Sequence, residues 1–282
     1  MAAPLQVPNQ YLALDPVIVA APTVRCGTTL LQRLLNSSLN AVIYGEEIAA
    51  YVASLTQTMV GFLQLCDQIG HTMDADLQAA LEGRQDWRPA LMPPVSIIQS
   101  AWVETFYQIP AALSAYGASI GRPIFGFKRP DLTSGMMRAM LMLMPRARVI
   151  YVYRRLDDVL KSAKARKFVS TEAEVAQLCR NWATNLQECA AMASDPRVLF
   201  LKYELLEANG VGNIAAIEQF TGAHGVKADV LGVRINTFRG DEAHGHSATQ
   251  YIEPMPLTAS DRAAIREHAG AVMAQLYGAA GA

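Results

Sequence analysis

The chain has 282 residues, of which 51% are hydrophobic, and its formal net charge is −1 at pH 7. This length and hydrophobic fraction are sufficient for one large domain with a substantial core. A net charge near zero provides no overall attraction to nucleic acid or to an anionic membrane surface, so any anion-binding site must be local.

The sequence shows no sign of targeting, of a membrane span or of division into domains. Its first residues, MAAPLQVPNQYLALDP, lack a basic region and a long apolar run, and no stretch approaches about 18 uninterrupted apolar residues. Without a Pro/Gly/Ser-rich linker, residues 1–282 are predicted to form a single domain. The four cysteines have no CxxC spacing, which favours free thiols in a cytoplasmic protein.

The first predicted element is a strand at residues 17–21, VIVAA, because this run is apolar on both faces, as in a covered parallel sheet. A short loop follows, and residues 28–39 carry leucines at helical spacing. Such a strand, turn and helix N-terminus form an anion cradle, since the first N–H groups of the helix face the loop. Arg25 adds a positive charge there, and Thr28 and Thr29 add hydroxyl donors. The alternative is an ordinary turn capped by threonine.

Strands and helices alternate along the rest of the chain. Short apolar runs predict strands at residues 41–44, 124–128, 148–153 and 198–202. Helical spacing predicts helices at residues 47–70, 96–117, 134–144, 155–167 and 171–192, with helix and loop from Tyr203 onward. Residues 71–94 are polar and contain Gly83 and three prolines, which predicts a mobile surface segment beside a substrate cleft. The alternation predicts an open parallel sheet flanked by helices, an α/β fold.

Cations follow several of the predicted strands. Arg25 lies in the loop after the first strand, Lys128 ends the third, and Arg154 follows the fourth. Ligands of open parallel sheets bind beyond the carboxyl ends of the strands, so we expect these three side chains to converge on one crevice. The loop at Arg25 has neither the first glycine nor the lysine of the Walker pattern, and it lacks GxGxxG. A nucleoside triphosphatase or a Rossmann dehydrogenase is therefore disfavoured.

Five short blocks occur in the order of one known family. Residues 25–30 (RCGTTL) and 153–162 (YRRLDDVLKS) resemble the 5′-phosphosulfate loop and the 3′-phosphate motif of sulfotransferases that use 3′-phosphoadenosine 5′-phosphosulfate (PAPS). Residues 45–47 (GEE), 128–130 (KRP) and 247–250 (SATQ) are most similar to the tyrosylprotein sulfotransferase branch of that family. The chain thus resembles a soluble, bacterial-type member of this branch, and the five ordered blocks make the resemblance specific.

The resemblance implies a P-loop-like sulfotransferase fold that transfers a sulfuryl group from PAPS to a hydroxyl, with adenosine 3′,5′-bisphosphate (PAP) as product and no metal. Cations contribute most in such transfers, because the transition state is loose and its charge lies on oxygens. Arg25 and Lys128 would neutralise the bridging and leaving oxygens, and Ser247 matches a further catalytic position. The resemblance implies that the donor PAPS is bound by Arg25, Cys26, Gly27, Thr28, Thr29, Arg154, Ser162, Arg166 and Tyr203.

Three of these assignments have open alternatives. Arg166 lies four residues past Ser162 on the same helix face. It is either a third hydrogen-bond donor to the phosphate or a solvated charge on the helix. Tyr203 resembles a position near the adenine, or it packs in the core. The base that accepts the hydroxyl proton is placed by the resemblance at Glu46, although Glu47 is adjacent. His244 and His246 are the other candidates for this base. They could also bind a metal ion, but no carboxylate or cysteine pattern completes such a site.

The sequence departs from the family pattern at a few positions, and these departures bear on the class of acceptor and on the alternative functions. Cys26 replaces a loop serine with a weak donor, which predicts weaker donor binding and a loop sensitive to oxidation. Residues 48–50 (IAA) and Glu253 stand where the tyrosylprotein branch carries cations on its acceptor side. This favours a small-molecule hydroxyl over a peptide tyrosine, with no nucleic-acid or membrane partner. The rival functions are a small-molecule kinase and a non-catalytic nucleotide-binding module.

Overall fold

Five parallel strands form the sheet at the centre of this computed structural model, which describes residues 7–84, 91–232 and 252–278. Their order across the sheet is β2-β3-β1-β4-β5, and every neighbouring pair is parallel. The strands are β1 (Val17–Ala20), β2 (Ala41–Tyr44), β3 (Ile124–Lys128), β4 (Arg148–Tyr153) and β5 (Val198–Lys202). The predicted open parallel sheet is therefore confirmed, with each strand within a residue of its expected bounds.

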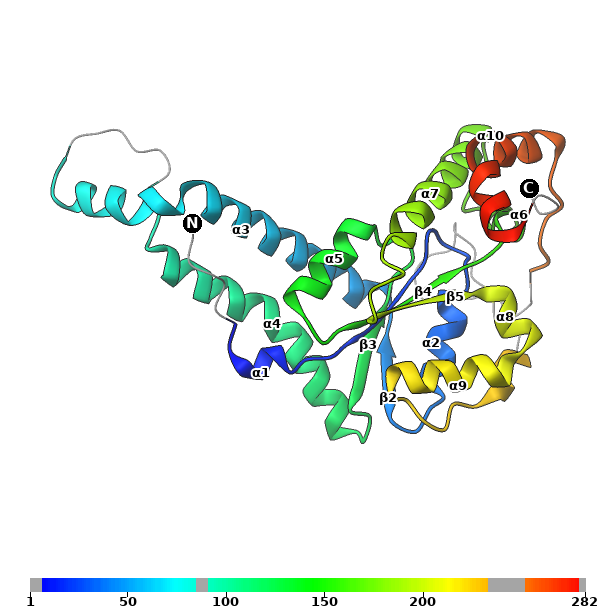
Figure 1. The fold of residues 1–282 in the computed structure, drawn as a ribbon, viewed down its shortest axis with the longest axis horizontal. Helices are drawn as coiled ribbons and strands as arrows, with labels where there is room; N and C mark the ends of the chain where they lie inside the picture. The colour runs from blue at the N-terminus through cyan, green and yellow to red at the C-terminus, as the bar shows by residue number, and fades with distance from the viewer. Residues whose placement is uncertain (1–6, 85–90, 233–251, 279–282) are drawn as a thin grey trace.

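Helices cover the sheet, and two of them form an arm beside it. The arm consists of α3 and α4, which lie side by side and extend away from the strands (Figure 1). The helices are α1 (Asn9–Leu12), α2 (Thr28–Asn36), α3 (Glu46–Leu81), α4 (Val95–Ser119), α5 (Ser134–Leu143), α6 (Leu156–Ala165), α7 (Glu172–Ala190), α8 (Tyr203–Ala208), α9 (Gly210–Thr221) and α10 (Ala259–Tyr277), with a 3₁₀ turn, η1, at Ala228–Gly232. All four residues of β1 are buried, as expected for a central strand.

Two helix ends differ from the expectation, for local reasons. The helix α3 continues to Leu81 instead of ending near Gly70, because residues 71–81 contain good helix formers and no proline. It stops just before Gly83, whose φ of 81° is left-handed. The helix α2 ends at Asn36, where Ser37 and the following serine donate their hydroxyls to carbonyls of the last turn. The mobility of residues 71–94 stays a prediction, and residues 85–90 lie outside the described residues.

One helix segment among the described residues, Glu46–Gly70 of α3, is long and apolar enough to cross a membrane by length and composition. A third of it, 33%, is buried inside the protein. Core helices of soluble proteins pass the same test, so a single such segment is weak evidence for a membrane span. The absence of a membrane partner stays a prediction.

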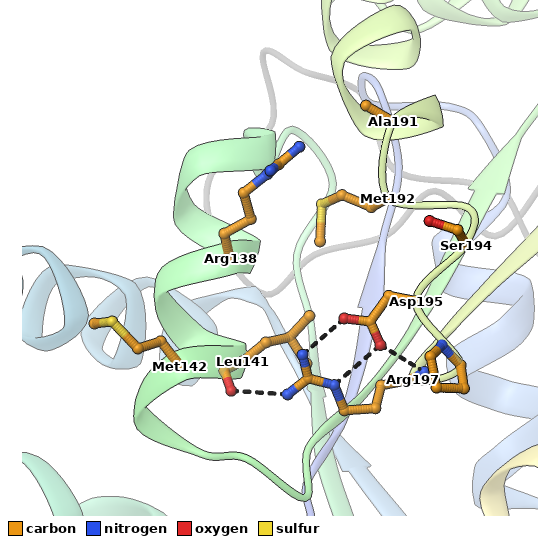
Figure 2. A pocket seen from close by; sticks show the side chains of 9 residues that line it. Arg138, Leu141, Met142, Ala191, Met192, Ser194, Asp195 and Arg197 are labelled. Atoms are coloured by element: carbon orange, nitrogen blue, oxygen red, sulfur yellow. Dashed lines mark hydrogen bonds and ion pairs between the residues drawn. The ribbon is translucent and has the colours of Figure 1, made fainter.

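The amino-terminal edge of the sheet is held by a first polar network, between α5 and the loop that precedes β5. Arg197 donates to both carboxylate oxygens of Asp195, at 2.7 and 3.0 Å, and to the carbonyl of Leu141 at 3.0 Å (Figure 2). These contacts form one wall of a shallow cavity of about 540 Å³. None of the residues predicted to bind or react lines this cavity.

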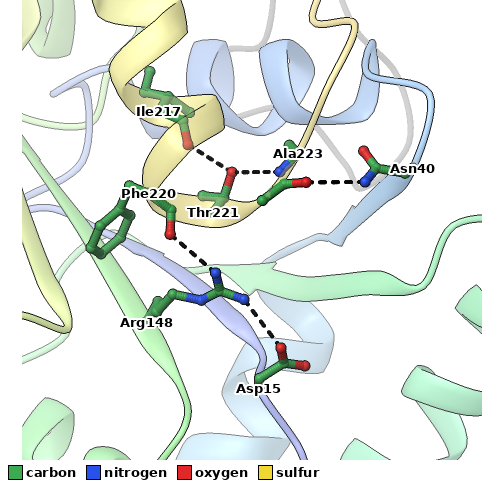
Figure 3. A network of polar contacts seen from close by, with 8 residues as sticks. Asp15, Asn40, Arg148, Ile217, Phe220, Thr221 and Ala223 are labelled. Carbon is green, nitrogen blue, oxygen red and sulfur yellow. Dashed lines mark hydrogen bonds and ion pairs between the residues drawn. The ribbon is translucent and has the colours of Figure 1, made fainter.

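A second network ties the end of α9 to the start of the sheet. Arg148, the first residue of β4, donates to the carbonyl of Phe220 and to the carboxylate of Asp15, both at 3.1 Å (Figure 3). Asn40, just before β2, donates to the carbonyl of Gly222 at 3.1 Å. Because these networks occupy the amino-terminal edge, the carboxyl ends of the strands are the edge left for a ligand.

Candidate active site

The loop between β1 and α2 has a strained backbone. Arg25 has a φ of 72° and Gly27, the N-cap of α2, has a φ of 106°. A Cβ atom at Gly27 would lie 2.3 Å from Cδ2 of Tyr203, the first residue of α8. Only glycine fits there, because a side chain would both occupy an unfavourable φ and collide with the tyrosine ring. The predicted cradle loop therefore lies directly against Tyr203.

This loop forms one wall of a cleft of about 910 Å³ at the carboxyl ends of the strands. The cleft is lined by the loop and by residues of α2, α6 and α8, together with Glu253 and Pro254. Its cationic side chains outnumber its acidic ones by five to three. The cations are Arg25, Arg33, Arg154, Lys161 and Arg166, and the acids are Asp158, Glu207 and Glu253. A chain with a net charge of −1 thus has a locally positive cleft.

Two arginines of the cleft have buried nitrogen atoms that are ready to donate. Nη2 of Arg25 and Nε of Arg154 are buried and have no hydrogen-bond partner among the described residues. Burial, together with Arg166 and Arg154, lowers the pKa of Arg25 to about 10. Three guanidinium groups in one cleft repel one another, and a bound anion would relieve that repulsion. The arrangement is therefore suited to a phosphate or sulfate group.

Ser162 and Arg166 come from the same face of α6, as their spacing predicted. Ser162 accepts a hydrogen bond from Nε of Arg25 at 3.2 Å. Arg166, the C-cap of α6, is only 1% exposed and lines the cleft. Its burial excludes the alternative that Arg166 is a solvated helix charge.

Tyr203 also lines the cleft, and it is partly buried. The Cζ atom of Arg154 lies 4.3 Å from the centroid of its ring, within the range of a cation–π contact. A ring face and a guanidinium at the wall of a cleft are suited to an aromatic heterocycle with a phosphate attached. Tyr203 both packs against the core and lines the cleft, so its role near the adenine stays a prediction.

A second group of polar side chains lies where β3 and α3 meet. Lys128 is 6% exposed, and its Nζ donates to Oε1 of Glu46 and, at 3.4 Å, to Oγ1 of Thr29. Glu46 is the first residue of α3, and its side chain is 53% exposed. Since Thr29 also lines the cleft, the Glu46–Lys128 pair adjoins it. Glu47 lies in the same first turn and is exposed, but the ion pair with Lys128 is made by Glu46.

Sequence reasoning missed Asp131, a second acidic residue near Glu46. Asp131 has a φ of 69° and pairs with Arg129 at 3.5 Å. Partial burial raises the pKa of its carboxyl, Arg129 opposes that shift, and Glu46 adds to it. No motif pointed to Asp131, because its proximity to Glu46 depends on the turn after β3.

Two cations of the cleft were also missed. Arg33 lies four residues after Thr29 on α2, and Lys161 directly precedes Ser162 on α6. The helical spacing of Arg33 from Thr29 was the available signal, because side chains four residues apart share a face.

The expectation for Cys26 needs correction. Its side chain is fully buried, it contacts Oγ1 of Thr23 at 3.6 Å, and it does not line the cleft. The thiol therefore does not stand in for the hydroxyl of the family's loop serine. Burial raises the pKa of Cys26 to about 11, so the oxidisable thiolate is scarce at neutral pH, contrary to the predicted sensitivity to oxidation. All four cysteines are free and buried.

The C-terminal predictions divide into two groups. Ser247, Gln250, His244 and His246 lie outside the described residues. Glu253 is described and lines the same cleft as Arg154, and its place on the acceptor side stays a prediction. Among the described residues, no group of three His, Cys, Asp or Glu side chains is placed to hold a metal ion.

Comparisons with known proteins agree with this geometry. The family model described as the sulfotransferase family matches residues 16–225. The sulfotransferase domain from the curacin biosynthetic pathway is 12% identical, with 90% of this chain and 97% of that chain covered and a TM-score of 0.50. A sulfotransferase from Alicyclobacillus acidocaldarius is 13% identical, with 93% and 94% covered and a TM-score of 0.50. At these identities the two structures show a shared fold. No curated protein matches the sequence.

Proposed function

Because the chain belongs to the sulfotransferase family, we propose that it transfers a sulfuryl group from PAPS to the hydroxyl of a small molecule and releases PAP. One observation carries the choice of donor: in a cleft walled by Tyr203, Arg25 and Arg154 offer buried guanidinium nitrogens that have no hydrogen-bond partner among the described residues. A donor with an aromatic base and two separate phosphate groups matches such a cleft better than an isolated anion does.

The donor groups divide over the two sides of the cleft. In this proposal the 3′-phosphate is bound by Arg154, which follows β4, and by Ser162 and Arg166, which are a residue of α6 and its C-cap. The phosphosulfate is bound by the loop from Arg25 to Thr29, whose N–H groups begin α2. Cys26 contributes through its backbone only, since its thiol is buried in the core.

The transfer breaks the bond between sulfur and the bridging oxygen of the donor and forms a bond between sulfur and the acceptor oxygen. Lys128 and Arg25 stabilise the negative charge that develops on the oxygens of the leaving phosphate. Glu46 accepts the hydroxyl proton, so the acceptor oxygen attacks as its negative charge grows. The pair between Lys128 and Glu46 keeps both groups beside Thr29 before the substrates bind.

The acceptor is a small molecule in this proposal. Residues 48–50, which follow the two glutamates in α3, carry no charge, and Asp131 adds a carboxylate near Glu46. An acidic peptide would be repelled by these carboxylates. A peptide tyrosine in an acidic context is therefore disfavoured.

A thermal melt tests the donor. PAP is expected to raise the melting temperature, because a ligand that binds only the folded state stabilises it by about 2.7 kcal/mol at a hundredfold excess over Kd. Arg154→Ala should abolish the shift, whereas Arg146→Ala, which removes an exposed arginine outside the cleft, should retain it. An equal shift with ATP would favour a kinase, and no shift with PAP would reject the proposal.

Turnover separates an enzyme from a binding module. With PAPS and a panel of small alcohols and phenols, the proposed enzyme releases PAP in proportion to the sulfated product. Binding of PAP without release of PAP from PAPS over the whole panel would identify a non-catalytic module instead.

A further inference from the structure

The C-terminal helix α10 ends beside the residues that wall the donor cleft. It lies beyond residues 16–225, the part of the chain that the family model matches, and it packs on α7 and α6 (Figure 1). Its last residue, Tyr277, is partly buried and packs against the hydrophobic core. A residue outside the matched region thus reaches the carboxyl ends of β4 and β5.

On the β4 side, Tyr277 contacts both neighbours of Arg154. Its ring packs edge-on against that of Tyr153, with centroids 6.4 Å apart and an interplanar angle of 75°. The Cζ atom of Arg155 lies 5.4 Å from the centroid of the Tyr277 ring. Both contacts are within the ordinary range for aromatic and cation–π pairs.

On the β5 side, Tyr277 contacts both neighbours of Tyr203. The Nζ atom of Lys202 lies 4.0 Å from the ring centroid, and the Tyr277 hydroxyl donates to Oε2 of Glu204 at 3.4 Å. The other oxygen of Glu204 accepts the backbone N–H of Arg155 at 2.8 Å. Glu204 therefore joins the two strand ends, and Tyr277 contacts both of them.

We infer that Tyr277 is a positioning residue for the donor, which holds Arg154 and Tyr203 at their 4.3 Å separation through the four residues that flank them. The inference rests on the proposed function, in which this pair binds PAPS. Cation–π and ring contacts become stronger when they are shielded from water, so a partly buried ring fixes both strand ends at once. Loss of the ring would let the pair separate and would weaken donor binding.

The competing explanation is that Tyr277 only attaches α10 to the protein. Met273, one turn earlier on α10, is fully buried and makes none of the contacts described above. Met273→Ala is therefore a matched control: it weakens the packing of α10 but leaves the contacts to the strand ends in place.

The experiment measures PAP affinity by calorimetry on the full chain. Tyr277→Ala is expected to raise Kd about tenfold, as loss of two cation–π contacts and a ring pair would. Tyr277→Phe keeps the ring and loses only a long hydrogen bond, so its Kd should stay within about twofold of the wild type. Met273→Ala should lower the melting temperature and leave Kd unchanged. In turnover, Tyr277→Ala should raise KM for PAPS with little change in kcat.

A double-mutant cycle tests whether Tyr277 acts through Tyr203. In a Tyr203→Ala background, Tyr277→Ala should have a much smaller effect on Kd, because coupled residues are not additive. If Tyr277→Ala does not fold, Tyr277→Leu replaces it, since leucine keeps apolar volume without an aromatic face. An unchanged Kd in the Tyr277 variant, or an equal rise in Met273→Ala, would overturn the inference. A wild-type chain that does not bind PAP would reject the proposed function itself, and the inference with it.

Discussion

Arg25 combines three unfavourable features in one residue. It has a left-handed φ of 72°, it is largely buried, and it faces Arg154 and Arg166. A left-handed backbone costs a residue with a side chain about 1–2 kcal/mol, and each buried like charge adds to that cost. Because Arg25 forms no ion pair with another described residue and its buried Nη2 atom has no hydrogen-bond partner among them, Arg25 is best explained as a residue that serves an anionic ligand.

The first prediction compares two substitutions that remove the same guanidinium. Arg25→Gly and Arg25→Ala should both lose the PAP-dependent thermal shift. Arg25→Gly should nevertheless be more stable than Arg25→Ala by about 1 kcal/mol, since glycine adopts a positive φ without strain. Urea unfolding of the two ligand-free variants measures the difference. Equal stabilities would mean that the backbone at this position relaxes when the side chain is removed.

The second prediction separates Glu46 from Glu47. Glu46→Gln removes the proposed base with little change in shape, so kcat should fall by about 100-fold or more. Glu47→Gln changes a neighbouring exposed charge in the same helical turn, and kcat should stay within about twofold. Initial rates at saturating PAPS give both values. A large loss in Glu47→Gln with a small one in Glu46→Gln would exchange the two roles.

At the scale of elements, the pairing of β1 with β3 depends on a glycine. Val17 and Gly126 are register partners, and a Cβ atom at Gly126 would lie 2.0 Å from the carbonyl oxygen of Val17. That atom belongs to the backbone and cannot move aside without displacing a central strand. The glycine therefore permits β1 and β3 to pair, and this pairing brings Lys128 at the end of β3 to Thr29 in the helix that follows β1.

The third prediction contrasts this glycine with one in α3. Gly126→Ala should destabilise the protein by on the order of 3 kcal/mol, because it overpacks the centre of the sheet. Gly61 lies in α3 with nothing within 4 Å of an added Cβ, so Gly61→Ala should stabilise the protein by about 0.5–1 kcal/mol. Thermal unfolding of both variants checks the opposite signs. A stable Gly126→Ala variant would show that β1 and β3 can shift apart.

The strands were predictable from the sequence, whereas several features of the site were not. Runs such as 149–152 are apolar on both faces, which indicates a covered parallel strand. The end of α3 depended instead on a few helix formers and on Gly83, where local preferences are nearly balanced. The burial of the Cys26 thiol and the proximity of Asp131 to Glu46 depend on loop dihedrals that no spacing rule specifies.

At the scale of the whole molecule, the two edges of the sheet have different roles. The amino-terminal edge carries the networks around Arg148 and Arg197, whose guanidinium groups donate to backbone carbonyls of α9 and α5. The carboxyl edge carries the cations and the strained loop. The satisfied hydrogen bonds at the amino-terminal edge stabilise the fold, and this stability offsets the free-energy cost of the strained loop and clustered cations at the carboxyl edge.

The fourth prediction concerns the whole core, which buries several thiols. Burial raises the pKa of Cys26, Cys179 and Cys189 to about 11, from 9.0 in the unfolded chain. Between these values the unfolded state has lost the protons that the folded state still binds, so the free energy of unfolding falls as pH rises. The stabilisation is fully present below pH 9. Arg25 acts in the opposite direction above about pH 10, whereas Tyr107, Tyr151 and Tyr277, whose pKa values burial also raises, act in the same direction as the thiols.

Urea unfolding at pH 8, 9, 10 and 11 measures this decline, which should total about 2 kcal/mol or more. Cys189→Ala removes one of the three thiols at a site outside the donor cleft, so its decline should be shallower than that of the wild type. A thiol reagent at pH 8 should leave the folded chain unmodified and react with four cysteines after unfolding. Rapid modification of the folded protein would contradict the burial on which the prediction rests, and with it the assignment of Cys26 to the core.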